Sequence, residues 1–334
     1  MYYIGRGKVD EIAQFITNEE KNSTIDFIVV DSPLKASQLF NLENAFHVRV
    51  LDRTALILMI FLHHARTNEA KLQVEYAILN YQVPYVTELV RRTKLGEHPG
   101  FLAGGEYKVD DYYELTKRRI RKIRADLTKI KTGRQQRRKH RRKSGYVLVT
   151  IAGYTNAGKS ALLNALTKTQ ILIDDRLFST VSTRTRRFRN SELLFTDTVG
   201  FIRNIPTQLV EAFKSTLEEI IFADHIVLLV DISDPFETII DKIQTSFKII
   251  DQLMVESFDT NSTSYSDEYT IKKPKFHLVF NKLDLDPEAT KKADKIVKLL
   301  EPEFFAHGIN GFLLISCKTM FGFDNLISSF SDYI

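Results

Sequence analysis

The chain has 334 residues with a formal net charge of +5, and its 43% of hydrophobic residues exclude an intrinsically disordered protein. Its one cysteine, Cys317, excludes a disulfide framework and fits a reducing cytoplasm. The N-terminus lacks an apolar signal core and the longest apolar run, residues 55–62, is too short for a bilayer, so we expect a cytoplasmic protein without a membrane span.

The length suffices for two domains, and the first of them, residues 1–143, is predicted to begin with a small α/β lobe at 1–52. Its helices are expected at 7–20 and 35–45, and its strands at 25–30 and 47–51. The lobe is too short to close a core alone, so it should pack on a helix at 53–82 whose first half is apolar on every side. Pro84 is expected to end this helix, because proline has no amide hydrogen to donate.

A loop rich in glycine and proline, at 83–108, joins this helix to a second long helix expected at 110–131. The second helix has the 3-4-3 apolar spacing of a coiled-coil seam, at Tyr113, Ile120, Ile123, Leu127 and Ile130. The pattern therefore predicts an antiparallel helical hairpin within residues 53–143.

The charge is unevenly distributed, because Lys117 to Lys143 contain fifteen Lys or Arg residues and one acid, Asp126. Such a block repels itself unless it meets a polyanion, and RNA is the polyanion that we expect. A solvated linker and an acidic membrane surface are the alternatives.

The segment Gly153-Tyr-Thr-Asn-Ala-Gly-Lys-Ser160 follows an apolar run at 146–152 and precedes a helix-like run at 161–166. Strand, loop and helix in this order are typical of a phosphate-binding loop, in which glycines let backbone amides surround phosphate oxygens. Lys159 is expected to reach the β- and γ-phosphates as a catalytic residue, and the Ser160 hydroxyl to bind Mg²⁺. The other nucleotide-binding residues expected here are Gly153, Tyr154, Thr155, Asn156, Ala157, Gly158 and Ala161.

Strands and helices alternate through residues 144–334, which predicts an α/β domain with a mostly parallel, doubly wound sheet. Strands are expected at 146–152, 193–196, 225–230, 276–280 and 311–315. Asp197-Thr-Val-Gly200 ends the second strand, where Asp197 can hold Mg²⁺ through water and the Gly200 amide can meet a γ-phosphate.

Asn281-Lys282-Leu-Asp284 ends the fourth strand. A carboxylate at Asp284 can accept from N1–H and the 2-amino group of guanine, whereas adenine offers neither donor, so the motif selects GTP over ATP. Ser316-Cys317-Lys318 ends the fifth strand and would place a backbone amide on guanine O6. In this order the motifs predict a P-loop GTPase domain that binds GTP and GDP.

The run Asp197-Thr-Val-Gly-Phe-Ile-Arg-Asn-Ile-Pro-Thr-Gln-Leu-Val-Glu-Ala-Phe-Lys-Ser-Thr-Leu-Glu-Glu219 resembles the switch II signature of the HflX family of translation-associated GTPases. Segments at 3–9, 51–54 and 71–75 and the glycine-rich loop resemble the same family, so the likeness covers nearly the whole chain. It implies that the N-terminal domain reaches into the peptidyl-transferase region of the large ribosomal subunit, where it meets rRNA. It also implies that GTP is used to split or rescue stalled ribosomes.

Three departures from the family pattern concern the start, the glycine-rich loop and the end of the chain. Because the sequence starts at the Gly5-Arg-Gly-Lys8 stretch, we expect the family's leading strand and helix to be missing. Its loop reads Gly100-Phe-Leu-Ala-Gly-Gly-Glu106 where the family has Gly-Pro-Gly-Glu. It stops at the helix after Ser316, so we expect it to resemble the shorter archaeal members.

By the same resemblance, Thr180 in Phe178-Ser-Thr-Val181 aligns with the switch I threonine that binds Mg²⁺ and the γ-phosphate. Nearby hydroxyls, at Ser179, Ser182 and Thr183, are the alternatives. Asn156 occupies the place where some related G domains bind a monovalent cation, so K⁺ binding there and a hydrogen bond within the loop are both open.

We therefore predict a monomeric GTPase that docks on the large ribosomal subunit and hydrolyses GTP slowly when alone. Phe201 stands where many G proteins have a water-orienting glutamine, so the partner is expected to complete the site, with Arg184, Arg186 and Arg187 as internal alternatives. Two other functions remain open: an assembly GTPase for the subunit, and an RNA-binding module with a structural GTP site. Residues 256–273 are expected to form a flexible surface insertion.

Overall fold

The computed structural model describes residues 2–19, 24–65, 67–94, 106–167, 184–189, 191–201, 217, 219–261, 273–330 and 333. They form two compact units that divide inside one long helix, between Ile130 and Lys131. Each unit contains its own cluster of buried apolar side chains. This division falls earlier in the chain than the boundary expected between residues 143 and 144, and that boundary stays a prediction.

The α/β lobe of the first unit consists of α1 (Arg6–Glu19), β1 (Phe27–Val30), α2 (Ala36–Phe46) and β2 (Arg49–Asp52). The two strands pair in parallel, with Phe27 opposite Arg49. His47 ends α2 in the left-handed region, at a φ of 54°, and turns the chain toward β2. The lobe's core contains Val9, Ile16, Leu42, Phe46, Val48 and Val50. The four predicted elements are therefore confirmed, with shifted ends.

The single helix expected at 53–82 is wrong. The chain forms two helices there, α3 (Arg53–His64) and α4 (Asn68–Lys94), and Pro84 lies inside α4. Each helix starts at its own cap, because the Asp52 side chain accepts the amide of Ala55 and the Thr67 hydroxyl accepts the amide of Ala70.

Tertiary packing explains why Pro84 does not end α4. The helix packs on α2 and α3, and the Tyr85 hydroxyl donates to the buried carboxylate of Glu43 in α2. Ala77 before the proline and Val86 after it are both buried. A proline in a helix interior costs about 3 kcal/mol, and burial of larger α4 side chains such as Val86 and Leu89, at about 2 kcal/mol each, offsets this.

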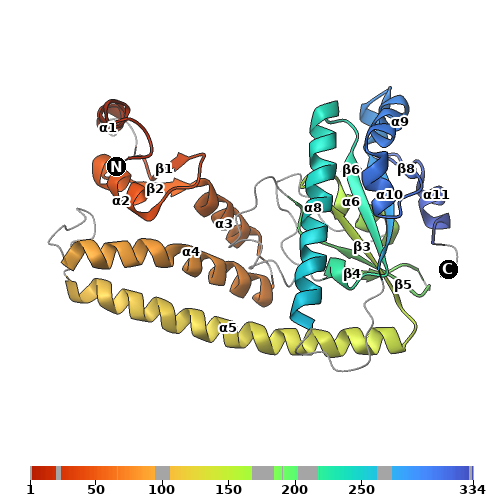
Figure 1. The fold of residues 1–334 in the computed structure, drawn as a ribbon, viewed down its shortest axis with the longest axis horizontal. Helices are drawn as coiled ribbons and strands as arrows, with labels where there is room; N and C mark the ends of the chain where they lie inside the picture. Colours follow the sequence, from red (N-terminus) through yellow and green to blue (C-terminus); the bar gives the residue numbers. More distant parts are fainter. Residues whose placement is uncertain are drawn as a thin grey trace. The chain divides into compact units, whose positions relative to one another are not determined.

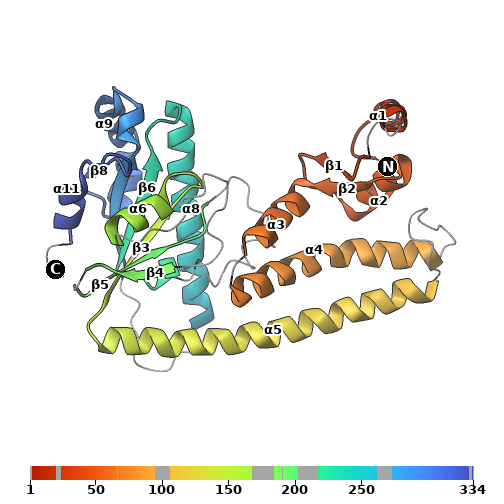
Figure 2. The same ribbon diagram turned by 180° about the vertical axis from the view of Figure 1, so that it is seen from behind.

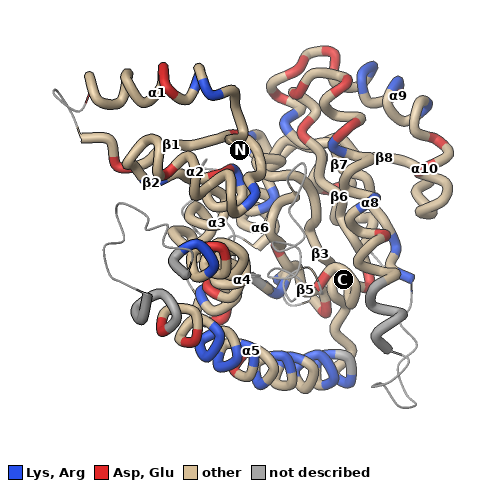
Figure 3. Tube along the Cα trace, turned by 60° about the vertical axis from the view of Figure 1, so that its left-hand side comes forward, with Lys and Arg blue, Asp and Glu red and all other residues tan. Residues whose placement is uncertain are grey.

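Helix α5 (Glu106–Lys143) lies antiparallel beside α4, as Figures 1 and 2 show. Its Arg119 donates through Nε and Nη2 to the Glu75 carboxylate of α4, at 2.6 and 2.7 Å. The predicted hairpin is therefore confirmed. The second helix is longer than expected, since it continues through the basic segment to Lys143 (Figure 3). Residues 95–105, with most of the glycine-rich loop, lie outside the described residues.

The second unit contains a sheet of six strands in the order β4-β5-β3-β6-β7-β8. The strands are β3 (Val147–Gly153), β4 (Arg184–Arg187), β5 (Leu193–Asp197), β6 (His225–Asp231), β7 (Lys275–Asn281) and β8 (Phe312–Leu314). All neighbours pair in parallel except β4 and β5. The predicted mostly parallel sheet is confirmed, whereas the antiparallel edge strand β4 was not predicted.

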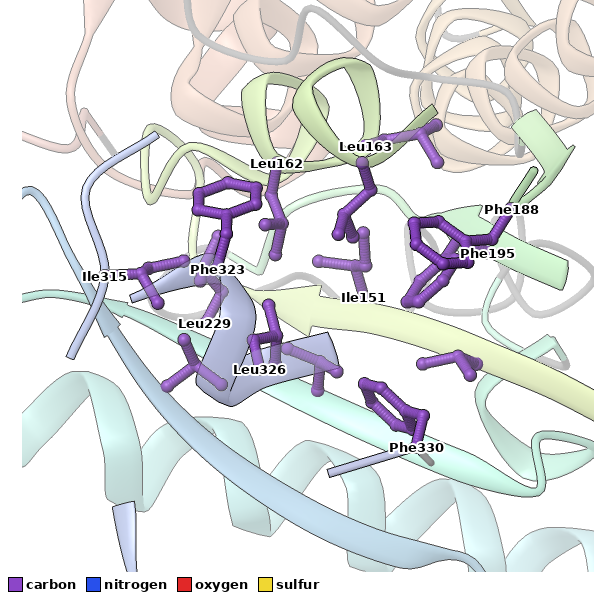
Figure 4. Close-up of a cluster of buried hydrophobic side chains, with 14 of the residues drawn as sticks. Ile151, Leu162, Leu163, Phe188, Phe195, Leu229, Ile315, Phe323, Leu326 and Phe330 are labelled. Atoms are coloured by element: carbon purple, nitrogen blue, oxygen red, sulfur yellow. The ribbon is translucent and has the colours of Figure 1, made fainter. Parts of the chain in front are cut away.

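Among the described residues, the helices that follow the first strand of this unit are α6 (Lys159–Thr167), α8 (Phe236–Asn261), α9 (Ala289–Leu299), α10 (Glu301–Ala306) and α11 (Phe323–Ser328). Leu162 of α6 and Leu326 of α11 pack with Ile151 and Leu229 in one buried cluster (Figure 4). Phe247 of α8 packs instead against Phe276 of β7 and Phe304 of α10. The expected insertion at 256–273 is wrong at its start, because α8 runs to Asn261, and 262–272 lie outside the described residues.

Candidate functional site

The predicted phosphate loop connects the carboxyl end of β3 to the first turn of α6. Gly158 has a φ of +95°, and a Cβ there would lie 2.3 Å from Nδ2 of Asn281. A side chain would therefore collide with a neighbouring motif. Asn156 is also left-handed, with a φ of 65°, which asparagine tolerates better than most residues.

Lys159 is buried at the base of this loop, with 7% of its surface exposed. Its Nζ donates to the carbonyl of Tyr154 at 2.7 Å. Burial lowers the pKa of Lys159 to about 8, although the Asp197 carboxylate opposes this shift. The ammonium group is thus held within the loop, where it can meet phosphate oxygens.

The two described residues predicted to hold Mg²⁺ lie together. The Ser160 hydroxyl donates to Oδ2 of Asp197 at 2.7 Å. A hydroxyl and a carboxylate are hard oxygen donors, so this pair fits the metal. Gly200 lies close by, since a Cβ added to it would be 2.8 Å from Nζ of Lys159.

Phe201 is tied to the phosphate loop through its backbone. Its amide donates to the Gly153 carbonyl and its carbonyl accepts from the Thr155 amide, both at 3.0 Å. The ring is 1% exposed. The side chain therefore packs in the interior.

Asn281 joins two of the predicted motifs. Its Nδ2 donates to the Ala157 carbonyl of the phosphate loop at 2.9 Å, and its Oδ1 accepts the Cys317 amide at 3.1 Å. The residue is 2% exposed.

Burial also raises the pKa of the Cys317 thiol to about 12, so this thiol stays protonated at neutral pH.

Asp284 lies in the turn after β7, in the 3₁₀-helix Leu283–Leu285. Its Oδ1 accepts the Ser316 hydroxyl at 2.6 Å. Lys282 precedes it in the left-handed region, and its Nζ lies 2.6 Å from Oδ2 of Asp231. Lys318 is exposed. The structure thus brings Asn281, Asp284, Ser316 and Cys317 together, while their roles toward a nucleotide stay predictions.

Thr180 and its alternatives Ser179, Ser182 and Thr183 lie outside the described residues. Strand β4 carries the three arginines considered as internal catalytic groups. Arg187 is directed elsewhere, because its Nε donates to the Ser191 carbonyl at 2.8 Å and its guanidinium lies over the Tyr146 ring. Arg184 is paired opposite Asp197 in the ladder.

Two residues near Asp284 were missed from the sequence, Asp231 and Lys292. Asp231 ends β6, one residue beyond the predicted strand, and accepts both the amide and the hydroxyl of Ser233. Lys292 lies in the first turns of α9 and donates to Asp286 at 2.8 Å. An acidic residue directly after a buried parallel strand was the available signal for Asp231. Lys292 had none, because two of its three contacts, with Ile232 and Asp234, are some sixty residues away in the sequence.

The basic segment is only partly exposed. Arg137, Lys139 and Lys143 are exposed, whereas Arg134 is buried. Arg138 is inward as well, since its Nη2 lies 2.7 Å from Oε1 of Glu219 and its guanidinium covers the ring of Phe222 at 4.2 Å. The segment is therefore not uniformly solvated.

No helix within the described residues is long and apolar enough to cross a membrane. Comparison with known families gives three matches. Residues 1–62 match the family described as GTP-binding GTPase N-terminal, residues 64–141 match GTP-binding GTPase Middle Region, and residues 148–282 match 50S ribosome-binding GTPase.

Several curated relatives carry the name GTPase HflX. The one from Thermococcus kodakarensis is 40% identical over 301 residues, which cover 90% of this chain and 63% of the relative. Those from Caldanaerobacter subterraneus subsp. tengcongensis and Hyperthermus butylicus are 35% and 36% identical, and the matches cover 98% and 88% of this chain and 69% and 74% of the relatives. The chain thus spans less than two thirds of the Thermococcus protein.

A solved structure has a similar fold. It is described as a GTP-binding protein from the hyperthermophilic archaeon Sulfolobus solfataricus in complex with GDP. It is 26% identical, with a TM-score of 0.52, and the match covers 99% of this chain and 85% of that chain.

Proposed function

Because the chain belongs to the HflX family of GTPases, we propose that it binds GTP and GDP together with Mg²⁺ and hydrolyses GTP. The side chain of Asn281 supports this most directly. It bonds at one end to Ala157 in the phosphate loop and at the other to the amide of Cys317. One buried residue therefore links the segment proposed for the phosphates to the segment proposed for the base.

In this proposal Lys159 and the Gly200 amide meet the phosphates, while Ser160, Asp197 and Thr180 hold Mg²⁺. Bound Mg²⁺ would supply positive charge that offsets the negative charge of the phosphates. The buried Lys159 ammonium adds a fixed positive charge in a site of low dielectric, where it acts more strongly than in water.

The preference for guanine tests the proposal. Replacement of Asp284 by Ala leaves two donors of guanine without an ionised acceptor, which should cost about 2 to 4 kcal/mol in binding. Titration with fluorescent GTP and ATP measures this loss, with Asp294→Ala on the exposed face of α9 as the control. Equal guanine affinity in Asp284→Ala and the unchanged protein would remove the assignment.

We further propose that the protein acts in the cytoplasm on the large ribosomal subunit and its rRNA, and that GTP controls splitting or rescue. The match of residues 148–282 to a family described as 50S ribosome-binding GTPase supports this partner, as do the exposed basic residues of α5. Monosomes sedimented with the protein and a non-hydrolysable GTP analogue should release free subunits. Intact monosomes with normal subunit binding would instead favour an assembly role. Equal subunit affinity with GTP and GDP would favour a structural GTP site.

Asn156 also carries a proposal, the binding of K⁺ beside the phosphates. Such an ion would supply positive charge that an arginine supplies in other GTPases. The left-handed backbone of Asn156 is compatible with this role and with a hydrogen bond inside the loop. Equal turnover in K⁺ and Na⁺ buffers would exclude the ion.

A further inference from the structure

The turn that carries Asp284 is held from two sides. On one side the Ser316 hydroxyl donates to Asp284 itself and the Leu283 amide donates to the Ile315 carbonyl. On the other side lie Asp231, the last residue of β6, and the loop that follows it. Two residues of the nucleotide-binding motifs take part in the second contact: Lys282 through its side chain, and Asn281 through its carbonyl, which accepts the Ile232 amide at 3.1 Å.

Lys292 joins this turn to the loop after β6. Its Nζ donates to the carbonyl of Ile232 at 2.8 Å, to the carbonyl of Asp234 at 2.7 Å and to Oδ2 of Asp286 at 2.8 Å. An ammonium group has three donors, so all of them are used. The side chains of Lys292 and Asp286 are each 19% exposed, so the contact is largely sheltered from water.

A second connection runs in parallel with the first. Oδ2 of Asp231 accepts Nζ of Lys282 at 2.6 Å, and Oδ1 accepts the Ser233 amide and hydroxyl. The loop after β6 is thus internally braced. Lys282 and Asp286, which lie on either side of Asp284 in the sequence, are both tied to it.

We propose that Lys292 is a positioning residue for base selection, which fixes Asp284 where its carboxylate can accept from guanine. Lys292 does not touch the nucleotide in this assignment and acts through the turn. The inference rests on the proposed role of Asp284, and it adds a specificity-determining residue outside the four motifs.

The affinities for GDP and for inosine diphosphate separate positioning from folding. Inosine lacks the 2-amino group, so the ratio of the two affinities reports how well Asp284 meets that donor. Lys292→Met keeps the side-chain length and removes the ammonium group. It should lower the ratio by about tenfold, because a small misplacement of a hydrogen-bonding group costs much of its effect. Lys291→Met is the matched control, since Lys291 is exposed and its side chain pairs with the exposed carboxylate of Glu288.

Asp286→Ala provides a second variant should Lys292→Met fail to fold. It removes one of the three contacts of Lys292, and it should lower the same ratio with a smaller effect. An equal loss of GDP and inosine diphosphate affinity in both variants, or a ratio like that of Lys291→Met, would overturn the proposal. Asp284→Ala tests the premise separately. If the affinity ratio of Asp284→Ala matches that of the unchanged protein, the proposed role of Asp284 is wrong. If that ratio is lowered while the ratios of Lys292→Met and Asp286→Ala are unchanged, only the positioning role is rejected.

Discussion

Lys159 is buried at a site where an anion is expected, and this makes its charge sensitive to pH. Burial lowers its pKa to about 8, so the neutral amine becomes the main form of the free protein above that pH. The protonated form binds phosphate better, so nucleotide binding must raise this pKa again. We therefore expect GDP affinity to be constant below about pH 7 and to fall toward pH 9, by at most about tenfold per pH unit.

Titration of fluorescent GDP across this pH range measures the effect. Lys159→Ala should bind more weakly and show no such fall, because the titrating group is absent. A parallel fall in the variant and the unchanged protein would assign the dependence to another group.

The residues of the site differ in how well the sequence predicts them. Asn281 and Asp284 could be found because a short motif at the end of a strand defines their surroundings. Lys292 could not, because its partners Ile232 and Asp234 are some sixty residues away in the chain. Thr180 lies outside the described residues, and its role stays a prediction.

At the scale of the element, the basic residues of α5 differ in how far they are exposed to solvent. Arg137, Lys139 and Lys143 are exposed, and charge reversal at these three should weaken binding to large subunits and reduce its salt dependence. Each lost phosphate contact should lower the slope of log affinity against log salt by about one. Sedimentation binding at several salt concentrations measures this.

The matched control reverses Lys295 and Lys298, two exposed lysines of α9. GTP affinity of the isolated protein should be unchanged in both sets. A salt slope that is unaltered by the α5 reversals would mean that this part of the helix does not contact RNA.

Arg138 belongs to the same basic run but should behave differently. The Arg138 and Glu219 side chains are 11% and 5% exposed, so Arg138→Ala leaves a buried carboxylate without its partner. We expect this to lower the free energy of unfolding by about 3 kcal/mol. Arg137→Ala, beside it but exposed, should change the value by less than about 0.5 kcal/mol.

Chemical unfolding of the single and double variants checks this assignment. The double variant Arg138→Ala with Glu219→Ala should lose less stability than the two single losses added together. Additive losses would show that the two side chains do not stabilise each other.

Local patterns predicted elements well where burial follows a regular period, and less well where tertiary contacts decide. The parallel strands were found within one or two residues of their ends. The sequence prediction missed the break between α3 and α4, although residues 63–69 are mostly polar and Thr67 is a typical N-cap residue. Pro84 does not end α4 as predicted, since packing of α4 on the lobe outweighs the local cost of the proline. Strand β4 was missed because only its pairing with β5 defines it.

For the whole molecule, GTP hydrolysis is expected to be slow until the large subunit is bound. The Phe201 side chain has no polar group and is buried, so another group must orient the attacking water. Docking of the large subunit that completes the site is expected to raise the rate by as much as about 10⁵, as partner proteins do for other GTPases. Single-turnover hydrolysis with and without large subunits measures this.

A fast basal rate that large subunits leave unchanged would contradict this expectation and show that the chain's own catalytic groups suffice. The replacement Phe201→Gln is a poor probe of water positioning. It buries an amide in an apolar place, so it is expected to destabilise the fold rather than to change the basal rate through the water.

The division inside α5 affects how this chain can be taken apart. The helix is one continuous element, yet its residues from Lys131 onward belong to the unit that contains the sheet. A GTPase fragment that begins at β3 would lack Arg138 and would carry Glu219 as a buried, uncompensated charge. A fragment boundary that keeps this ion pair therefore lies inside α5, before Arg138. Gene segments that exchange this GTPase unit between proteins would need to carry the last turns of α5 with them.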